Sequence, residues 1–170
     1  AAGNQKTFLR EYQLAVLRNP GDPEARAHLA NALQATDDLP GAEAEYREAL
    51  RLRPDSAEYR YRFGTILLTL DKRKEAKAEL ERAVRLRRAY PEALGVLGDL
   101  LVEEGNYSLA AATYNDALRW RHQDAELHVK MSAVLRMLGD FDAALELATR
   151  AEDLEPGSVA VLRELGNVYA

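Results

Sequence analysis

The sequence excludes several classes of protein through what it lacks. None of its 170 residues is cysteine, so disulfides, thiolate catalysis and cysteine-based zinc sites are excluded. No run of about 18 apolar residues is present, so no membrane-spanning helix is predicted. The N-terminal stretch AAGNQKTFLREY has no basic start followed by an apolar segment, and therefore does not resemble a signal peptide. Lack of cysteine suits both the cytoplasm and an oxidising compartment such as the periplasm, which leaves the compartment unknown.

Charge and composition narrow the partner class. The chain is 47% hydrophobic and 30% charged, which is typical of a folded, soluble protein. Its net charge is −5, so no overall positive charge favours a nucleic-acid partner. We therefore predict a protein or peptide partner, and neither nucleic acid nor a direct membrane span.

Residue types that carry catalysis or bind metals are scattered. The three histidines, His28, His122 and His128, form neither an H-E-x-x-H pattern nor a pair four residues apart. Asp124 and Glu126 lie near two of them, but Asp124 is needed as a helix cap, so surface and packing roles are favoured over a metal site. No glycine-rich phosphate loop is present. The sequence therefore predicts that the protein is not an enzyme, with no catalytic residue, no cofactor site and no metal site.

What the chain does contain is a repeat with a period of 34 residues and no insertion. A small residue recurs at one place in each copy, two alanine positions follow at fixed spacings, and three of the five copies end in proline. A self-similar period of this length is typical of a helical repeat array. The small positions are Ala30, Gly64, Gly98, Ser132 and Gly166, the alanine positions are Ala42, Ala76, Ala110 and Ala144 with Ala15, Ala49, Ala83, Ala117 and Ala151, and the final positions are Pro20, Pro54, Arg88, His122 and Pro156.

Each copy is predicted to form a hairpin of two helices. Large apolar residues recur at i, i+3, i+4 and i+7, which makes one apolar face per helix. The small residues allow close approach where the two helices cross. Gly105 and Gly139 can supply the left-handed residue that ends a first helix. Good N-cap residues precede the first helix of four copies: Asp22, Ser56, Asp124 and Ser158.

These columns resemble the tetratricopeptide repeat family, which shares the small residue, both alanines, an aromatic residue in the second helix and the final proline. Tyr46 and Tyr114 stand at the aromatic position. Arg26 and Arg60 depart from the family, which often has tryptophan there. The resemblance implies an all-α fold, a right-handed α–α superhelix (TPR solenoid) of antiparallel helix pairs, with repeats at residues 23–56, 57–90, 91–124 and 125–158.

Incomplete repeats are predicted at both ends of the sequence. Residues 1–22 are interpreted as the second helix of a preceding repeat, with Gly3 and Asn4 as its turn. Residues 159–170 are interpreted as the first helix of a following repeat, which would expose an apolar face. That face could pair with a second copy, so a homo-oligomer through the end faces is one hypothesis.

The resemblance also implies where a partner binds, because in this family the first helices line a concave groove. The periodic core does not require the residues at these positions, so they are free to specify a ligand. Their mixed character suits an extended peptide or a partner helix. By position the predicted groove residues are Asn31, Gln34, Tyr61, Thr65, Leu68, Thr69, Asp99, Val102, Glu103, Ala133, Arg136, Met137, Arg163 and Asn167.

Arginines also recur with the period of the repeat, near the ends of the second helices. One interpretation is that they stabilise helix C-termini and pair with a row of glutamates of the same period. The other is a strip for an acidic partner. We favour the first, because arginine and glutamate share one period. The arginines are Arg51, Arg53, Arg85, Arg87, Arg119 and Arg121, and the glutamates are Glu24, Glu58, Glu92 and Glu126.

The sequence thus predicts a non-catalytic protein-interaction scaffold that binds its partner in the groove. Two alternatives remain. The chain could be a regulatory or substrate-presenting segment of a larger enzyme, such as a glycosyltransferase, or of a secretion or assembly complex. It could instead be a self-associating structural module.

Overall fold

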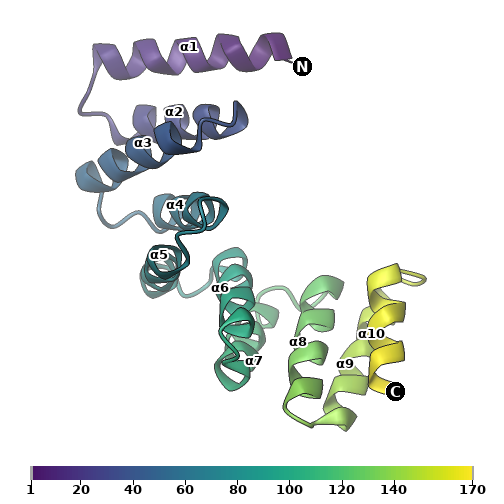
Figure 1. The fold of residues 1–170 in the computed structure, drawn as a ribbon. Helices are drawn as coiled ribbons and strands as arrows, with labels where there is room; N and C mark the ends of the chain where they lie inside the picture. Colours follow the sequence, from purple (N-terminus) through teal and green to yellow (C-terminus); the bar gives the residue numbers. More distant parts are fainter. Residues whose placement is uncertain (1, 170) are drawn as a thin grey trace. The chain divides into compact units, whose positions relative to one another are not determined.

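The computed structural model describes residues 2–169, and over that range the chain consists of ten α-helices without a strand (Figure 1). The predicted all-α fold is therefore confirmed. The helices are α1 (Ala2–Arg18), α2 (Pro23–Ala35), α3 (Leu39–Leu52), α4 (Ala57–Thr69), α5 (Arg73–Leu86), α6 (Pro91–Glu103), α7 (Tyr107–Leu118), α8 (Ala125–Met137), α9 (Phe141–Leu154) and α10 (Val159–Tyr169).

The helices are grouped in two compact units, unit 1 (Ala1–Arg87) and unit 2 (Arg88–Ala170). In unit 1, α2 packs against α3 and α4 against α5, while α1 contacts α2 and α3 contacts α4. In unit 2, α6 packs against α7 and α8 against α9, α7 contacts α8, and α10 lies on both α8 and α9. A turn of three residues joins the two helices of each pair, so they run antiparallel as predicted.

Two helices fall within each of the predicted segments 23–56, 57–90, 91–124 and 125–158. The boundaries of these repeats stay a prediction. None of the helices within residues 2–169 combines the length and the apolarity that crossing a bilayer requires.

Side chains fix where the first helices begin. The carboxylate of Asp22 accepts hydrogen bonds from the backbone N–H groups of Glu24 (2.8 Å) and Ala25 (3.3 Å) at the start of α2. The hydroxyl of Ser56 and the carboxylate of Asp124 do the same for α4 and α8. These bonds satisfy N–H groups that have no partner inside the helix, so the three predicted N-caps are confirmed.

The turns inside the helix pairs use one backbone conformation at a fixed spacing. Gly105 and Gly139 have φ angles of 74° and 83°, which confirms the left-handed residues predicted there. The matching positions in unit 1 are Asp37 (φ 65°) and Asp71 (φ 57°). Aspartate adopts this conformation more readily than most residues other than glycine, because its short side chain bonds to nearby backbone. The turn geometry is therefore common to both units although the residue type is not.

The small residues permit close crossing of the two helices in a pair. A Cβ atom added to Gly98 would lie 2.4 Å from Cε1 of Tyr114, and one added to Gly64 would lie 3.0 Å from Cγ of Leu80. Ser132 is fully buried, and its hydroxyl donates to the carbonyl oxygen of Ala144 (2.8 Å). The large apolar residues of the second helix therefore pack directly on the backbone of the first.

One sequence prediction about the first helix is wrong. Gly3 and Asn4 were predicted to form a turn, whereas both lie inside α1. A helix tolerates the cost of a single glycine, about 1 kcal/mol relative to alanine, and asparagine costs less. A Gly-Asn pair therefore favours a turn without requiring one.

Candidate partner-binding surfaces

A cleft of about 400 Å³ in unit 2 collects five of the predicted groove residues. It lies between α6, α7 and α8, and most of its lining is apolar. Binding sites in proteins are typically concave and mostly apolar with a few placed polar groups, which describes this cleft. The predicted residues that line it are Asp99, Val102, Ala133, Arg136 and Met137, joined by Tyr107, Tyr114, Lys130 and Val134.

The polar wall of the cleft is a hydrogen-bonded chain of three side chains. The hydroxyl of Tyr114 donates to Oδ1 of Asp99 at 2.6 Å, and the ammonium of Lys130 donates to Oδ2 of the same carboxylate at 2.9 Å. Lys130 also pairs with Glu126 at 2.9 Å. Both oxygens of Asp99 are therefore held in place by neighbours from two other helices, while its side chain remains 42% exposed to a ligand.

Titration of these groups is shifted toward the forms that keep the network intact. Burial, followed by the contact with Asp99, raises the pKa of Tyr114, so the hydroxyl stays a proton donor. Burial alone would lower the pKa of Lys130, but the carboxylates of Glu126 and Asp99 raise it overall. At neutral pH, Tyr114 and Lys130 therefore keep the protons that they donate to Asp99.

Arg136 is positioned by a buried carboxylate that the sequence analysis did not single out. Glu164, on α10, is only 5% exposed. Its Oε1 accepts from Nε of Arg136 (3.4 Å) and from the hydroxyl of Ser132 (3.2 Å), and its Oε2 accepts from the amide of Asn167 (3.3 Å). Glu164 therefore joins two predicted groove residues from α8 and α10. The terminal nitrogens of Arg136 are not part of this contact.

Three predicted residues of unit 2 do not line the cleft. Glu103 lies exposed at the end of α6, and Arg163 and Asn167 lie exposed on α10. Glu164 links Asn167 to Arg136 of the cleft.

In unit 1, the predicted residue Asn31 lies at the meeting point of two smaller pockets, each of about 230 Å³. The first is lined by aromatic and small residues of α1 and α2, and here Tyr12 stacks on His28 with ring centroids 5.2 Å apart. The second is lined by charged residues and Tyr59. The hydroxyl of Tyr46 donates to Oδ1 of Asn31 at 2.6 Å, which repeats in unit 1 the bond between Tyr114 and Asp99.

The other predicted residues of unit 1 lie on the same helices but line neither pocket. The hydroxyls of Thr65 and Thr69 donate to carbonyl oxygens one turn earlier in α4, at 2.7 and 3.1 Å. Leu68 packs partly against the hydrophobic core, whereas Gln34 is exposed and Tyr61 is half-buried. Unit 1 therefore brings fewer of its predicted groove residues together than unit 2.

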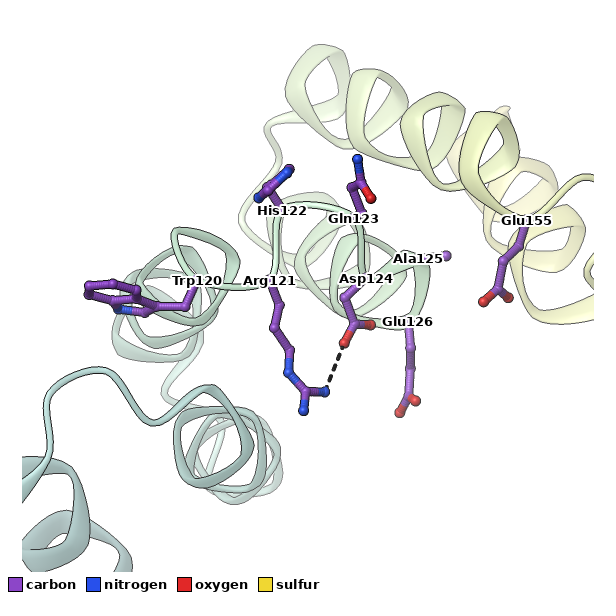
Figure 2. A pocket seen from close by; sticks show the side chains of 8 residues that line it. All are labelled: Trp120, Arg121, His122, Gln123, Asp124, Ala125, Glu126 and Glu155. Carbon is purple, nitrogen blue, oxygen red and sulfur yellow. Dashed lines mark hydrogen bonds and ion pairs between the residues drawn. The ribbon is translucent and has the colours of Figure 1, made fainter.

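A larger hollow of about 530 Å³ lies where α7 passes into α8, lined by residues 120–126 and Glu155 (Figure 2). Its lining is mainly polar, and Arg121 pairs there with Asp124 at 3.4 Å. Trp120 points away from the other labelled side chains (Figure 2). His122 borders this hollow, whereas His128 is buried in α8. Within residues 2–169, no three histidine or acidic side chains are grouped to hold a metal ion. The apolar cleft is the better candidate for a ligand.

Two of the six recurring arginines pair with the predicted row of glutamates, and three pair with carboxylates three or four residues away. Arg53 reaches Glu24 at 3.1 Å, and Arg121 reaches Glu92 in the same way. Arg51 and Arg119 pair instead with carboxylates of their own helices, Glu48 and Asp116. Arg53 and Arg121 therefore tie the end of the second helix of a pair to the start of the first helix of the same pair.

Two signals in the sequence could have found the residues that were missed. A tyrosine at the aromatic position follows Asn31 and Asp99 by 15 residues, and both pairs are hydrogen-bonded. Lys130 lies 31 residues after Asp99, close to the period of the repeat, where side chains of adjacent first helices meet. Glu164 carried no such signal, because a single glutamate in a predicted helix is usually exposed.

Two family models of the tetratricopeptide repeat match the chain, one over residues 67–133 and the other over residues 9–57. A comparison with curated proteins gave no match.

Among solved structures, the chain is similar to YrrB, described as a TPR protein with an unusual peptide-binding site. The two are 26% identical, the match covers 93% of this chain and 81% of YrrB, and the TM-score is 0.84. MamA from Desulfovibrio magneticus RS-1 is 23% identical over 93% of this chain and 89% of its own, with a TM-score of 0.81. PilF of Pseudomonas aeruginosa is 20% identical over 99% and 78%, with a TM-score of 0.85. The last two likenesses show the fold alone. With the repeat columns, the helix pairs and both family models in agreement, the chain belongs to the tetratricopeptide repeat family and has the fold of a protein-interaction scaffold.

Proposed function

We propose that the protein is a non-catalytic scaffold that binds a peptide or a partner helix on the first-helix faces of its two units. The observation that carries this proposal is the cleft of unit 2, which gathers five residues chosen from their repeat positions alone. YrrB, a TPR protein with a peptide-binding site that is 26% identical to this chain, supports the same class of ligand.

The chemistry of the cleft suits one apolar side chain of a peptide together with its backbone. Val102, Ala133 and Met137 offer an apolar surface, and Met137 adapts its shape to different side chains because it is unbranched. Asp99 is held in place by two donors, and its exposed edge can accept a peptide N–H group. Arg136, held through Nε, can donate to a peptide carbonyl or carboxylate. Groups that are already positioned lower the entropy cost of binding.

Ala133 offers a direct test of this site. Peptides that bind the wild-type protein are first selected from a random display library, and their affinity is then measured for Ala133→Arg. The added side chain fills the cleft, so we expect the affinity to fall by at least about tenfold. The control is Ala112→Arg, which places the same side chain at an exposed position of α7. Circular dichroism establishes that both variants fold. Unchanged affinity of a folded Ala133→Arg for every selected peptide would reject the cleft as the binding site.

A second candidate function, self-association, is supported by the outer face of α10. Leu162 and Tyr169 are 51% and 74% exposed there. A Cβ atom added to Gly166 would touch nothing within 4 Å, unlike one added to Gly98, on which Tyr114 packs. Gly166 thus occupies the repeat position at which a second helix crosses the first, but no neighbouring atom packs on it. Sedimentation over a range of concentrations tests this function. We expect association that Leu162→Glu abolishes, and a monomer at every concentration would reject it.

A further inference from the structure

The pocket between α1 and α2 occupies the same repeat positions as the cleft of unit 2. It has a volume of about 230 Å³ and is called the aromatic pocket below. Five of its six lining residues correspond to residues of the cleft when the numbering is shifted by 102, which is three periods of 34. The two sites are therefore copies of one surface of the repeat. The pairs, with the residue of the aromatic pocket first, are Tyr12 and Tyr114, His28 and Lys130, Asn31 and Ala133, Ala32 and Val134, and Ala35 and Met137.

The sixth lining residue, Phe8, departs from the other copies of the repeat. The later copies have alanine at this position, and all four alanines are fully buried where the helices of a pair cross: Ala42, Ala76, Ala110 and Ala144. Phe8 is instead 50% exposed. A ring of this size prevents the close approach that alanine permits, because it would overpack a tight crossing. A second helix is therefore disfavoured on this face of α1, and the ring of Phe8 forms a wall of the aromatic pocket.

The aromatic pocket combines rings with small residues. Tyr12 stacks on His28 with 18° between the ring planes, and Phe8 adds a third ring. Ala32 and Ala35 stand where the cleft has larger side chains, which leaves space beside the rings. Among the described residues that line this pocket, none is aspartate, glutamate, lysine or arginine. Aromatic pairs attract each other by more than the area they bury, so this lining suits an uncharged ring.

Two polar groups at the aromatic pocket have no hydrogen-bond partner within residues 7–169. The hydroxyls of Tyr46 and Tyr114 donate to Asn31 and Asp99 at 2.6 Å. The hydroxyl of Tyr12 stands at the same repeat position, but over the same range it makes no such bond. Asn31 uses its Oδ1 atom for Tyr46, which leaves its Nδ2 group without an acceptor in that part of the chain. A bound peptide can supply both missing partners, because each of its backbone units carries a donor and an acceptor.

We propose that the aromatic pocket holds an aromatic side chain of a bound peptide, while Tyr12 and Asn31 form hydrogen bonds with the peptide backbone beside it. This inference rests on the proposed function, and it adds that the two units select different side chains. Asp99 and Lys130 give the cleft of unit 2 a charged wall, whereas the walls of the aromatic pocket are rings. Size agrees, because an apolar cavity of about 150 Å³ is large enough for benzene and this pocket has about 230 Å³.

The test uses three pentapeptides with blocked ends that differ only in their central residue, which is phenylalanine, cyclohexylalanine or glutamate, with glycine elsewhere. Each is titrated into the full chain while its backbone amide signals are followed by NMR. We expect the phenylalanine peptide to shift the signals of Ala32 and Ala35 until they saturate. The cyclohexylalanine peptide has the same shape of side chain without the aromatic electrons, and we expect it to bind about fivefold more weakly. The glutamate peptide should leave these signals unchanged.

Two variants of α1 and a matched control test the lining. Phe8→Ala removes one wall and should weaken binding of the phenylalanine peptide about fivefold. Tyr12→Phe keeps the ring, removes the hydroxyl and should weaken binding about threefold. The control is Leu14→Ala, which removes a large side chain of α1 that is 43% exposed and does not line the pocket, and it should change the affinity less than about twofold. Circular dichroism establishes that all three variants fold.

Several results would overturn the proposal. One is the absence of saturable shifts with the phenylalanine peptide, and another is equal affinity for its cyclohexylalanine counterpart. Equal weakening by Phe8→Ala and Leu14→Ala would reject the pocket, and unchanged affinity of Tyr12→Phe would reject the role of its hydroxyl. Self-association that Phe8→Ala abolishes in sedimentation would show that a second copy occupies the pocket instead.

Ala133→Arg separates the aromatic pocket from the cleft, because it should leave binding of the phenylalanine peptide unchanged. If Ala133→Arg abolishes that binding, the peptide occupies the cleft and the aromatic pocket is rejected. If Ala133→Arg instead has no effect on the peptides selected from the library, the cleft is rejected. Failure of one site is thus distinguished from failure of the other.

Discussion

Adding one methyl group at Gly98 should destabilise unit 2, whereas the same change at Gly166 should not. At Gly98 the new Cβ atom would lie 2.4, 2.7 and 2.8 Å from three ring carbons of Tyr114. That ring is 1% exposed, and its hydroxyl is bonded to Asp99 at 2.6 Å, so it cannot move away without breaking other contacts. At Gly166 the new atom would meet nothing within 4 Å.

The two variants separate packing from helix propensity. Replacing glycine by alanine inside a helix stabilises it by about 0.5–1 kcal/mol. Overpacking a tight core costs about 1–3 kcal/mol, and weakening the bond from Tyr114 to Asp99 adds about 1 kcal/mol. For Gly98→Ala we therefore expect a net loss of roughly 1–3 kcal/mol in the free energy of unfolding. For Gly166→Ala we expect a small gain or no change.

Thermal and urea unfolding followed by circular dichroism measure both effects. For a chain of this size, a change of 1 kcal/mol moves the melting temperature by about 2–4 °C. Tyr114→Leu in the background of Gly98→Ala should recover part of the loss that Gly98→Ala causes, because the smaller side chain leaves room for the methyl group. Equal stability of Gly98→Ala and Gly166→Ala would refute this prediction. The helix propensity of alanine would then outweigh the clash of its methyl group with Tyr114.

Three further predictions concern unit 1. Arg60→Ala removes one of the two cations that pair with Glu79, which is 9% exposed, and leaves Arg82 as the other. We expect it to cost about 1–2 kcal/mol in urea unfolding, whereas Arg51→Ala, at an exposed pair, should cost less than about 0.5 kcal/mol. Equal losses in these two variants would contradict the buried pairing. Burial alone would raise the pKa of Glu43, but its two cationic partners lower that pKa below 4.5. The ionised carboxylate of Glu43 therefore stabilises the fold fully above about pH 4.5, and this stabilisation is lost as the pH falls through the lowered pKa. Glu43→Gln should therefore reduce the melting temperature at neutral pH and have little effect in strong acid, and a loss independent of pH would contradict this. Ser56→Ala removes the hydroxyl that caps α4 and should lower the free energy of unfolding by about 1 kcal/mol in thermal unfolding. An unchanged free energy would indicate that water replaces this hydroxyl as the partner of the Tyr59 N–H group.

Local physics explains how much of the fold was predictable. An apolar period near 3.6, a capping residue at Asp22 or Ser56 and a left-handed residue at Gly105 each act within a few positions of the chain. The aspartates at 37 and 71 adopt the same conformation as Gly105, as their repeat position required. The error at Gly3 and Asn4 arose because a weak turn preference was given the weight of a strong one.

The candidate site was only partly predictable, for a reason of distance. Repeat position selected Asp99 and Arg136, but their partners come from other helices. Lys130 reaches Asp99 from 31 residues away, and Glu164 reaches Arg136 from 28 residues away. No local pattern marks a glutamate that will be buried, because its burial depends on which helix covers it.

The sequence alone determined that this chain forms pairs of helices with close crossings, because periodicity and the small residues act through the backbone of each pair. Only the tertiary structure decided which side chains meet. It showed that Asp99 is held by Tyr114 and Lys130, and that the carboxylates of α5 are used by neighbouring arginines. Hydrogen bonds and ion pairs act over a few ångströms, so they are set by how helices pack and not by where residues stand in the chain.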